Sequence, residues 1–117
     1  MTIRRIVPDL HGDPTRSRPF YEGVLGLELG MDMGWIVGFH SSANETAQLI
    51  VMSHDETAPV APDVTVENDD VDAAYARAQA GGYEIVHPLT DEPWGVRRFF
   101  VRDPNGAVIN VMHHIER

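Results

Sequence analysis

The chain has 117 residues, 43% of them hydrophobic, which is enough for one compact domain of ordinary size. Eighteen acidic residues face nine basic ones, and the formal net charge of -9 argues against a nucleic-acid partner. The chain has no cysteine and no lysine, which excludes disulfides, thiolate nucleophiles, Cys-ligated metals and Lys Schiff bases. No apolar run approaches the ~20 residues that a membrane-spanning helix needs, so we expect a cytoplasmic protein without membrane contact.

The first half of the chain predicts a strand, a helix and three more strands. Asp13 is the expected N-cap of the helix, and Pro14 suits the first helical position because it lacks an N–H. Gly26 is expected to end the helix. The apolar residues of the helix form a narrow stripe on one face: Phe20, Tyr21, Val24 and Leu25. The strands are predicted at 3–10, 27–31, 35–40 and 47–52.

The second half repeats this order. Asp70 is the expected N-cap of a second helix, and Asp72 lies in its first turn, where the helix dipole favours an anion. We expect both of these acids, and Asp69 beside them, to serve the helix and not catalysis. Gly81 and Gly82 are expected to end the helix. The strands are predicted at 64–68, 83–86, 97–102 and 107–113, with a tight turn at 103–106 (DPNG) between the last two.

The spacing of these signals indicates an internal duplication. The two N-caps, Asp13 and Asp70, are 57 residues apart, and the helix ends at Gly26 and Gly82 are 56 apart. Each distance is close to half the chain, so a repeated strand–helix–three-strand unit is the simplest explanation. We expect one domain, 1–117, with a first module at about 1–54, a linker at about 55–62 and a second module at about 63–117.

Three local motifs, in order across nearly the whole chain, resemble one superfamily. Residues 20–27 (FYEGVLGL) are similar to the helix-to-strand passage of vicinal-oxygen-chelate proteins, and 70–75 (DVDAAY) to the start of their second helix. Residues 94–100 (WGVRRFF), followed by 103–106, resemble their C-terminal hairpin. The superfamily includes glyoxalases, bleomycin-resistance proteins and extradiol dioxygenases. The resemblance implies an α+β fold of two βαβββ modules that form a cupped mixed sheet around a ligand cavity, completed by a homodimer.

The resemblance also implies a place for a metal, which superfamily enzymes bind with one His or Glu on each of four strands. The matching residues here are Ile6, Gln48, Asp63 and Asn110. Isoleucine has no donor atom, and neutral amides are poor ligands for a divalent transition metal. The residues therefore favour a protein that binds a small molecule without a cofactor, similar to the drug-sequestering bleomycin-resistance proteins.

Two enzyme hypotheses stay open beside this one. A glyoxalase-like lyase or dioxygenase would hold one divalent metal at a rearranged site, with Asp63 and either His40 or His113 as ligands. A metal-free enzyme would use Asp63 or Glu67 as a general base. On a strand, the adjacent His113 and His114 would point to opposite faces.

Strand alternation predicts which side chains face the ligand. Trp35 and Trp94 either stack on the ligand or belong to the core or dimer interface. Arg98 either clamps a ligand carboxylate or forms a structural salt bridge. The expected ligand is a small organic molecule, cationic or aromatic. The predicted ligand-binding residues are Gln48, Ile50, Met52, Asp63, Thr65, Trp35, Trp94, Arg98, Asn110 and Met112, with Val108 on the same face as Asn110 and Glu67 on the same face as Asp63.

Overall fold

The computed structural model describes residues 1–115 and divides the chain into two compact units. The N-terminal unit is Val7–Ala61, and the C-terminal unit combines Met1–Ile6 with the chain from Pro62 onward. Strand β1 (Ile3–His11) contributes its first four residues to the C-terminal unit and the rest to the N-terminal unit. The chain thus divides at the end of the predicted linker, but its first six residues belong to the later unit.

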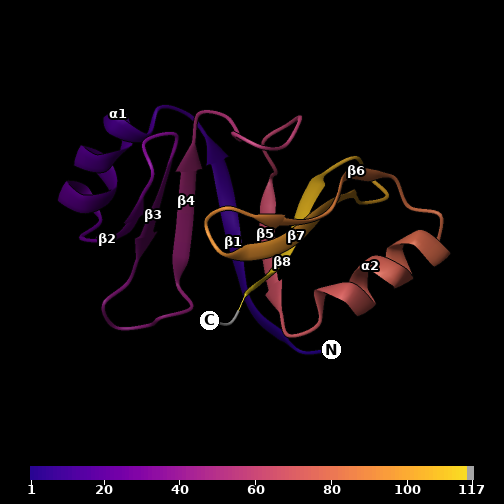
Figure 1. The fold of residues 1–117 in the computed structure, drawn as a ribbon. Coiled ribbons are helices and arrows are strands. Elements are labelled where there is room, and N and C mark those ends of the chain that lie inside the picture. The colour runs from indigo at the N-terminus through magenta and orange to yellow at the C-terminus, as the bar shows by residue number, and fades with distance from the viewer. Residues whose placement is uncertain (116–117) are drawn as a thin grey trace. The chain divides into compact units, whose positions relative to one another are not determined.

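The N-terminal unit consists of the second part of β1, a helical segment and three strands (Figure 1). Strand β4 pairs with β1 in parallel and with β3 antiparallel, and β3 pairs antiparallel with β2. The order across the sheet is therefore β2-β3-β4-β1. The elements after β1 are α1 (Pro14–Arg18), η1 (Pro19–Val24), β2 (Glu28–Asp32), β3 (Ile36–His40) and β4 (Gln48–Met52).

The C-terminal unit has the same plan. Strand β8 pairs with β5 in parallel and with β7 antiparallel, and β7 pairs antiparallel with β6. Two βαβββ modules of one topology, in a fold of the α+β class, confirm the prediction. The elements of this unit after β1 are β5 (Val64–Asn68), α2 (Val71–Ala80), β6 (Ile85–Glu92), β7 (Val96–Arg102) and β8 (Val108–His114).

The helix boundaries follow from the predicted caps. Asp13 accepts hydrogen bonds from the backbone N–H groups of Thr15 (2.9 Å) and Arg16 (3.4 Å). Asp70 accepts one from the N–H of Ala73 at 3.1 Å. After the helices, Gly26 and Gly82 have φ angles of 70° and 75°, a left-handed conformation that glycine adopts without strain. The local signals that begin and end each helix are confirmed.

The first helical segment departs from the expected regular helix. Pro19 has no N–H to donate, so the α-helix ends at Arg18 and the chain continues as the π-helical turn η1. Of the predicted stripe, only Tyr21 packs against the core cluster of this unit. The other three members are exposed: Phe20 by 51%, Val24 by 69% and Leu25 by 55%.

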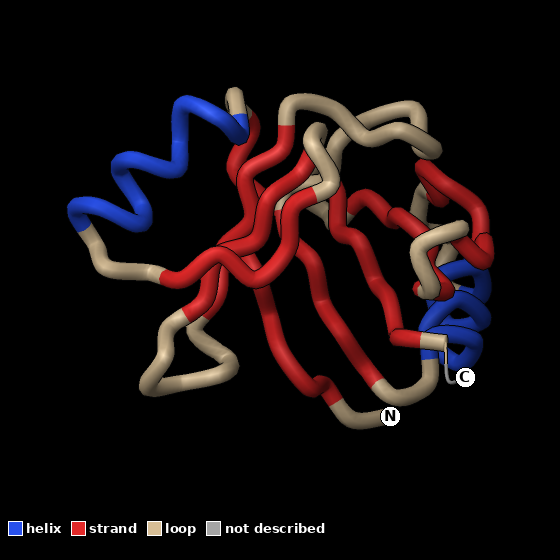
Figure 2. The backbone as a smooth tube through the Cα atoms, turned by 60° about the vertical axis from the view of Figure 1, so that its left-hand side comes forward, coloured by secondary structure: helices blue, strands red, loops and turns tan. Residues whose placement is uncertain are grey.

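Each unit packs a helical tyrosine on a buried phenylalanine of its sheet. In the N-terminal unit the rings of Tyr21 and Phe39 are 5.3 Å apart, and Phe39 is 1% exposed. In the C-terminal unit the rings of Tyr75 and Phe99 are 4.9 Å apart, and Phe99 is also 1% exposed. Helix α2 therefore covers one face of its strands (Figure 2), and the other face is left to different side chains.

Candidate functional site

The face of the C-terminal sheet opposite α2 carries most of its buried polar side chains, and we call it the polar face. Successive strand residues alternate between faces, so residues that alternate with Phe99 lie on it. The strand register pairs Thr65 with Asn110, and Asn110 with Phe100. Along β8, Val108, Asn110 and Met112 are all buried. The structure thus places Thr65, Asn110 and Met112 on one face, as the alternation predicts.

The buried side chain of Asn110 has one polar atom without a hydrogen-bond partner among the described residues. Its side chain donates from Nδ2 to Thr65 Oγ1 at 3.1 Å and is 7% exposed. Its Oδ1 has no partner among the described residues. Turning the amide over would only exchange the unpaired oxygen for an unpaired nitrogen. A buried amide atom without a partner costs about 1–3 kcal/mol, so a bound molecule that pairs with it gains affinity there.

Beside Asn110 lies a buried charged network. Arg98 Nε donates to Glu92 Oε2 at 2.6 Å, and His87 Nε2 is 3.1 Å from the same oxygen. All three residues are at most 7% exposed. The Arg98 guanidinium also lies 5.0 Å from the Trp94 ring centre and 4.7 Å from that of Phe100. Two roles were predicted for Arg98, a clamp on a ligand carboxylate and a structural salt bridge, and the structure shows the salt bridge.

His87 and Glu92 were missed because the strand that carries them was predicted to end at residue 86, whereas β6 runs to Glu92. A signal was present in the sequence. Glu92 and Arg98 flank the short turn at residues 93–95, which places opposite charges on neighbouring antiparallel strands.

The carboxylates considered for catalysis have structural partners. Asp63 is exposed at the start of β5, and its Oδ2 accepts the N–H of Val108 at 2.8 Å. Glu67 pairs with Arg5 through Oε1 and is 14% exposed. Asp63 contacts the start of β8, whereas His113 lies near its end, about 16 Å further along at ~3.3 Å per residue. The structure does not bring Asp63 and His113 together.

Of the acids at the start of α2, Asp70 is the N-cap and Asp72 lies in the first turn as expected, whereas Asp69 bonds a residue outside the helix. Asp70 caps the helix, Asp72 bonds Arg97, and Asp69 accepts the N–H of Thr2 at 2.7 Å. The neighbouring histidines diverge as predicted: His113 accepts the N–H of Val71 on the α2 side.

In the N-terminal unit, the predicted residues lie on the face opposite Phe39. The register pairs Ile50 with Gly38 and Met52 with Ile36, all out of phase with Phe39, and the same alternation places Gln48 and His40 there. The Gln48 amide nitrogen donates to the carbonyl of Glu45. The His40 ring lies against Gly30, where an added Cβ would come within 2.8 Å of it. Trp35 is 8% exposed, with its ring centre 6.0 Å from that of His54.

The residues at the four superfamily metal positions do not fit a divalent metal. Ile6 is 61% exposed and lies on the other face of β1 from Arg5, the partner of Glu67. The match of Ile6 to an inward-facing position is therefore wrong. Neighbouring residues of β1 face opposite sides of the sheet, so a match that is off by one residue selects the wrong face. The side chains of Gln48, Asp63 and Asn110 are each engaged with protein groups. Within residues 1–115, no three His, Asp or Glu side chains come together as a metal site.

Comparison with known proteins establishes the family. The profile of the Glyoxalase/Bleomycin resistance protein/Dioxygenase superfamily matches residues 10–111. The chain belongs to this superfamily, which confirms the resemblance drawn from the local motifs. No curated protein matches the sequence. No helix within residues 1–115 is long and apolar enough to cross a membrane.

Solved structures share the fold at low sequence identity. A superfamily member from Vibrio splendidus 12B01 is 21% identical over 96% of this chain and 99% of its own, with a TM-score of 0.71. A protein from Legionella pneumophila described as an NAD-dependent benzaldehyde dehydrogenase is 17% identical over 93% and 98%, with a TM-score of 0.73. The Mn(II)-bound glyoxalase from Novosphingobium aromaticivorans is 22% identical over 98% of this chain but 40% of its own, with a TM-score of 0.66. These similarities describe the fold alone.

Proposed function

We propose that this protein binds a small organic molecule without a metal, in the manner of the drug-sequestering bleomycin-resistance proteins, and that the polar face of the C-terminal unit supplies the binding site. The observation that carries the proposal is Asn110, whose buried amide has one atom without a hydrogen-bond partner. Phe100 and Met112 lie beside it on the same face. Apolar walls with a few well-placed polar atoms are typical of sites for small molecules.

The Arg98 contacts favour an aromatic ligand over a cationic one at this face. The guanidinium already lies over the rings of Trp94 and Phe100. A cationic ligand would have to compete with Arg98 for the faces of these rings, whereas a neutral aromatic molecule can stack on the guanidinium. An aromatic compound with a polar group that reaches Asn110 is the ligand that these residues suit.

Metal content tests the metal-free part of the proposal. Purified protein is incubated with a mixture of Ni²⁺, Zn²⁺, Mn²⁺ and Fe²⁺, desalted and submitted to elemental analysis. We expect no metal to be retained, because the four family positions offer no suitable donor set. About one metal ion per chain would overturn the proposal and favour the alternative, a glyoxalase-like lyase or dioxygenase.

A pair of asparagine variants tests the binding site. Asn110→Leu removes the unmet amide atom, so we expect at least tenfold weaker binding of aromatic probes and a free energy of unfolding within about 1 kcal/mol of the parent chain. The probes are bleomycin and a panel of simple neutral aromatic compounds, followed by tryptophan fluorescence.

Asn68→Leu is the matched control. Asn68 is also buried, at 1% exposure, but its amide is satisfied: Nδ2 donates to Met1 Sδ and Oδ1 accepts the N–H of Asp70. This variant should lose about 1–3 kcal/mol of stability and keep its probe affinity. If no probe binds the parent chain, or if Asn110→Leu binds every probe as tightly as the parent does, the proposed site is wrong.

A further inference from the structure

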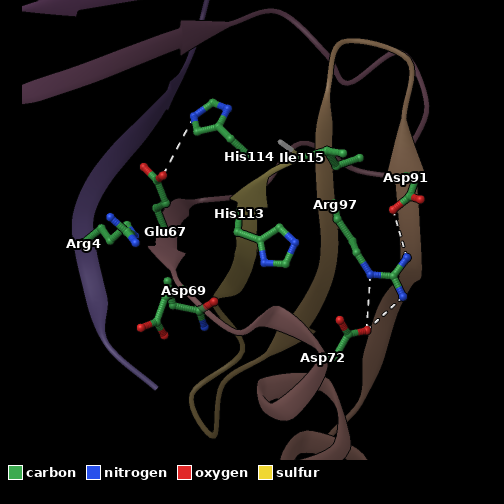
Figure 3. Close-up of a pocket in the computed structure, with 10 residues that line it drawn as sticks. Arg4, Glu67, Asp69, Asp72, Asp91, Arg97, His113, His114 and Ile115 are labelled. Atoms are coloured by element: carbon green, nitrogen blue, oxygen red, sulfur yellow. Dashed lines mark hydrogen bonds and ion pairs between the residues drawn. The ribbon is translucent and has the colours of Figure 1, made fainter. Parts of the chain in front are cut away.

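A pocket lies at the end of the C-terminal sheet where α2 begins, and its volume is about 730 Å³. That volume is within the range of pockets that hold small molecules. Arg97 and His113 line the pocket from the α2 side of the sheet, and Asp72 lines it from α2 itself (Figure 3). Asn110 does not line it. The pocket is therefore a different site from the one proposed on the polar face.

One arginine holds two carboxylates at one side of this pocket. Arg97 Nη2 donates to Asp72 Oδ1 at 2.9 Å, and Arg97 Nη1 donates to Asp91 Oδ1 at 2.8 Å (Figure 3). Each aspartate uses only its Oδ1, so the Oδ2 of each has no hydrogen bond from residues 1–115. The two side chains are 59% and 60% exposed. A single guanidinium between two carboxylates leaves one net negative charge at this side.

His113 lies in the middle of the pocket (Figure 3), and its Nδ1 atom accepts the N–H of Val71 at 3.4 Å.

At the opposite side of the pocket, Glu67 pairs with Arg5, Asp69 accepts the N–H of Thr2, and Arg4 adds a guanidinium. The surplus negative charge therefore lies at the first side, where the single guanidinium of Arg97 pairs with both Asp72 and Asp91. The Arg97 hydrogen bond lowers the pKa of Asp72, which keeps this carboxyl ionised at neutral pH.

We propose that this pocket binds a small organic amine, with the N–H groups of an ammonium or guanidinium bonded to the Oδ2 atoms of Asp72 and Asp91. Arg97 already fixes both carboxylates, so little side-chain freedom is lost on binding. Charge-assisted hydrogen bonds from a cation to two carboxylates are strong and directional. The proposal does not depend on the function proposed for the polar face.

Agmatine, which carries a guanidinium and an ammonium, is the probe, and 1,4-butanediol is its neutral counterpart. Each is titrated into ¹⁵N-labelled protein at 0.15 M salt, and amide chemical shifts are followed. We expect agmatine alone to bind, with the largest shifts around residues 72, 91 and 113. Binding of both compounds alike, or of neither, would overturn the proposal.

Two variants separate a specific site from general attraction to a chain of charge -9. Asp91→Asn removes one of the two carboxylates. Glu84→Gln removes the same charge from an exposed acid that pairs with Arg102 outside the pocket. We expect Asp91→Asn to weaken agmatine binding at least fivefold and Glu84→Gln to weaken it less than twofold. Equal losses in the two variants would show non-specific attraction and overturn the proposal.

Asn110→Leu makes the two proposals distinguishable. We expect it to leave agmatine affinity unchanged, since Asn110 does not line this pocket. A loss of agmatine binding in that variant would contradict a separate site.

Discussion

The two units share a scaffold but differ in the chemistry that they place on it. Both have the same strand order, and both pack a tyrosine from the helical segment on a phenylalanine of the third strand: Tyr21 on Phe39, and Tyr75 on Phe99. The opposite faces differ. On this face the C-terminal unit buries Thr65, His87, Glu92, Arg98 and Asn110, whereas the strands of the N-terminal unit bury one polar residue, Asp9. The duplicated plan is thus preserved on the helix side, where packing is apolar, and the chemistry varies on the other side.

The helical segments show the same contrast. Helix α2 runs unbroken from Val71 to Ala80 behind its aspartate cap. The first segment has an equivalent cap but contains Pro19, and it changes there from an α-helix to a π-helical turn. A single residue without an N–H therefore changes the geometry of one copy without altering its strand order.

The largest expected effects test whether the tyrosine–phenylalanine contact within each unit stabilises both units equally. Phe39→Ala and Phe99→Ala each delete a ring that is 1% exposed, and each should lower the free energy of unfolding by about 3–5 kcal/mol. Urea denaturation of both variants, followed by circular dichroism, gives the two values. A cost below about 1 kcal/mol in only one of them would show that the two contacts are not equivalent.

The buried network on the polar face should produce the next largest effect. Glu92→Gln keeps the size of the side chain but leaves Arg98 without its carboxylate partner, so we expect a loss of about 1.5–3 kcal/mol. Glu84→Gln is the control, because Glu84 is 64% exposed and its ion pair with Arg102 contributes at most about 1 kcal/mol. Thermal or urea unfolding of the two variants compares them. Equal losses would mean that the buried network contributes no more than a surface ion pair.

Most of the fold could be predicted because it is specified locally. The caps at Asp13 and Asp70 and the glycines at 26 and 82 act through their nearest neighbours in the chain, and the structure has each of them as predicted. Alternation along β8 was equally readable, since every second residue from Val108 to Met112 is buried.

The parts that were missed depend on register and on pairs distant in sequence. Ile6 was matched to an inward-facing position, but strand phase depends on the pairing of β1, and one residue reverses the face. The network of His87, Glu92 and Arg98 required knowing that β6 continues to Glu92. The pocket at the start of α2 joins residues as far apart as Arg4 and His113, and no local pattern indicates such a grouping.

The smallest predicted effect concerns pH and compares one exposed ion pair in each unit. Asp72 bonds Arg97 in the C-terminal unit, and Glu22 bonds Arg18 in the N-terminal unit; the hydrogen bond to the arginine lowers the pKa of each carboxyl. A carboxyl with a lowered pKa stabilises the folded state above its ordinary pKa, and this contribution is lost as the pH falls through the folded value.

We therefore expect the free energy of unfolding of Asp72→Asn at pH 7 to be about 0.2–1 kcal/mol below that of the parent chain, a small difference because the ion pair is exposed. This stability gap should close as the pH falls below about 4. Asp72 also lies in the first turn of α2, where the helix dipole favours its charge, whereas Glu22 lies in a π-helical turn. Glu22→Gln should consequently show a smaller gap that closes in the same direction. Urea unfolding of both variants and the parent at pH 7 and pH 3 measures these gaps, and a gap for Asp72→Asn that persists unchanged at pH 3 would mean that its origin is not the ionised carboxylate.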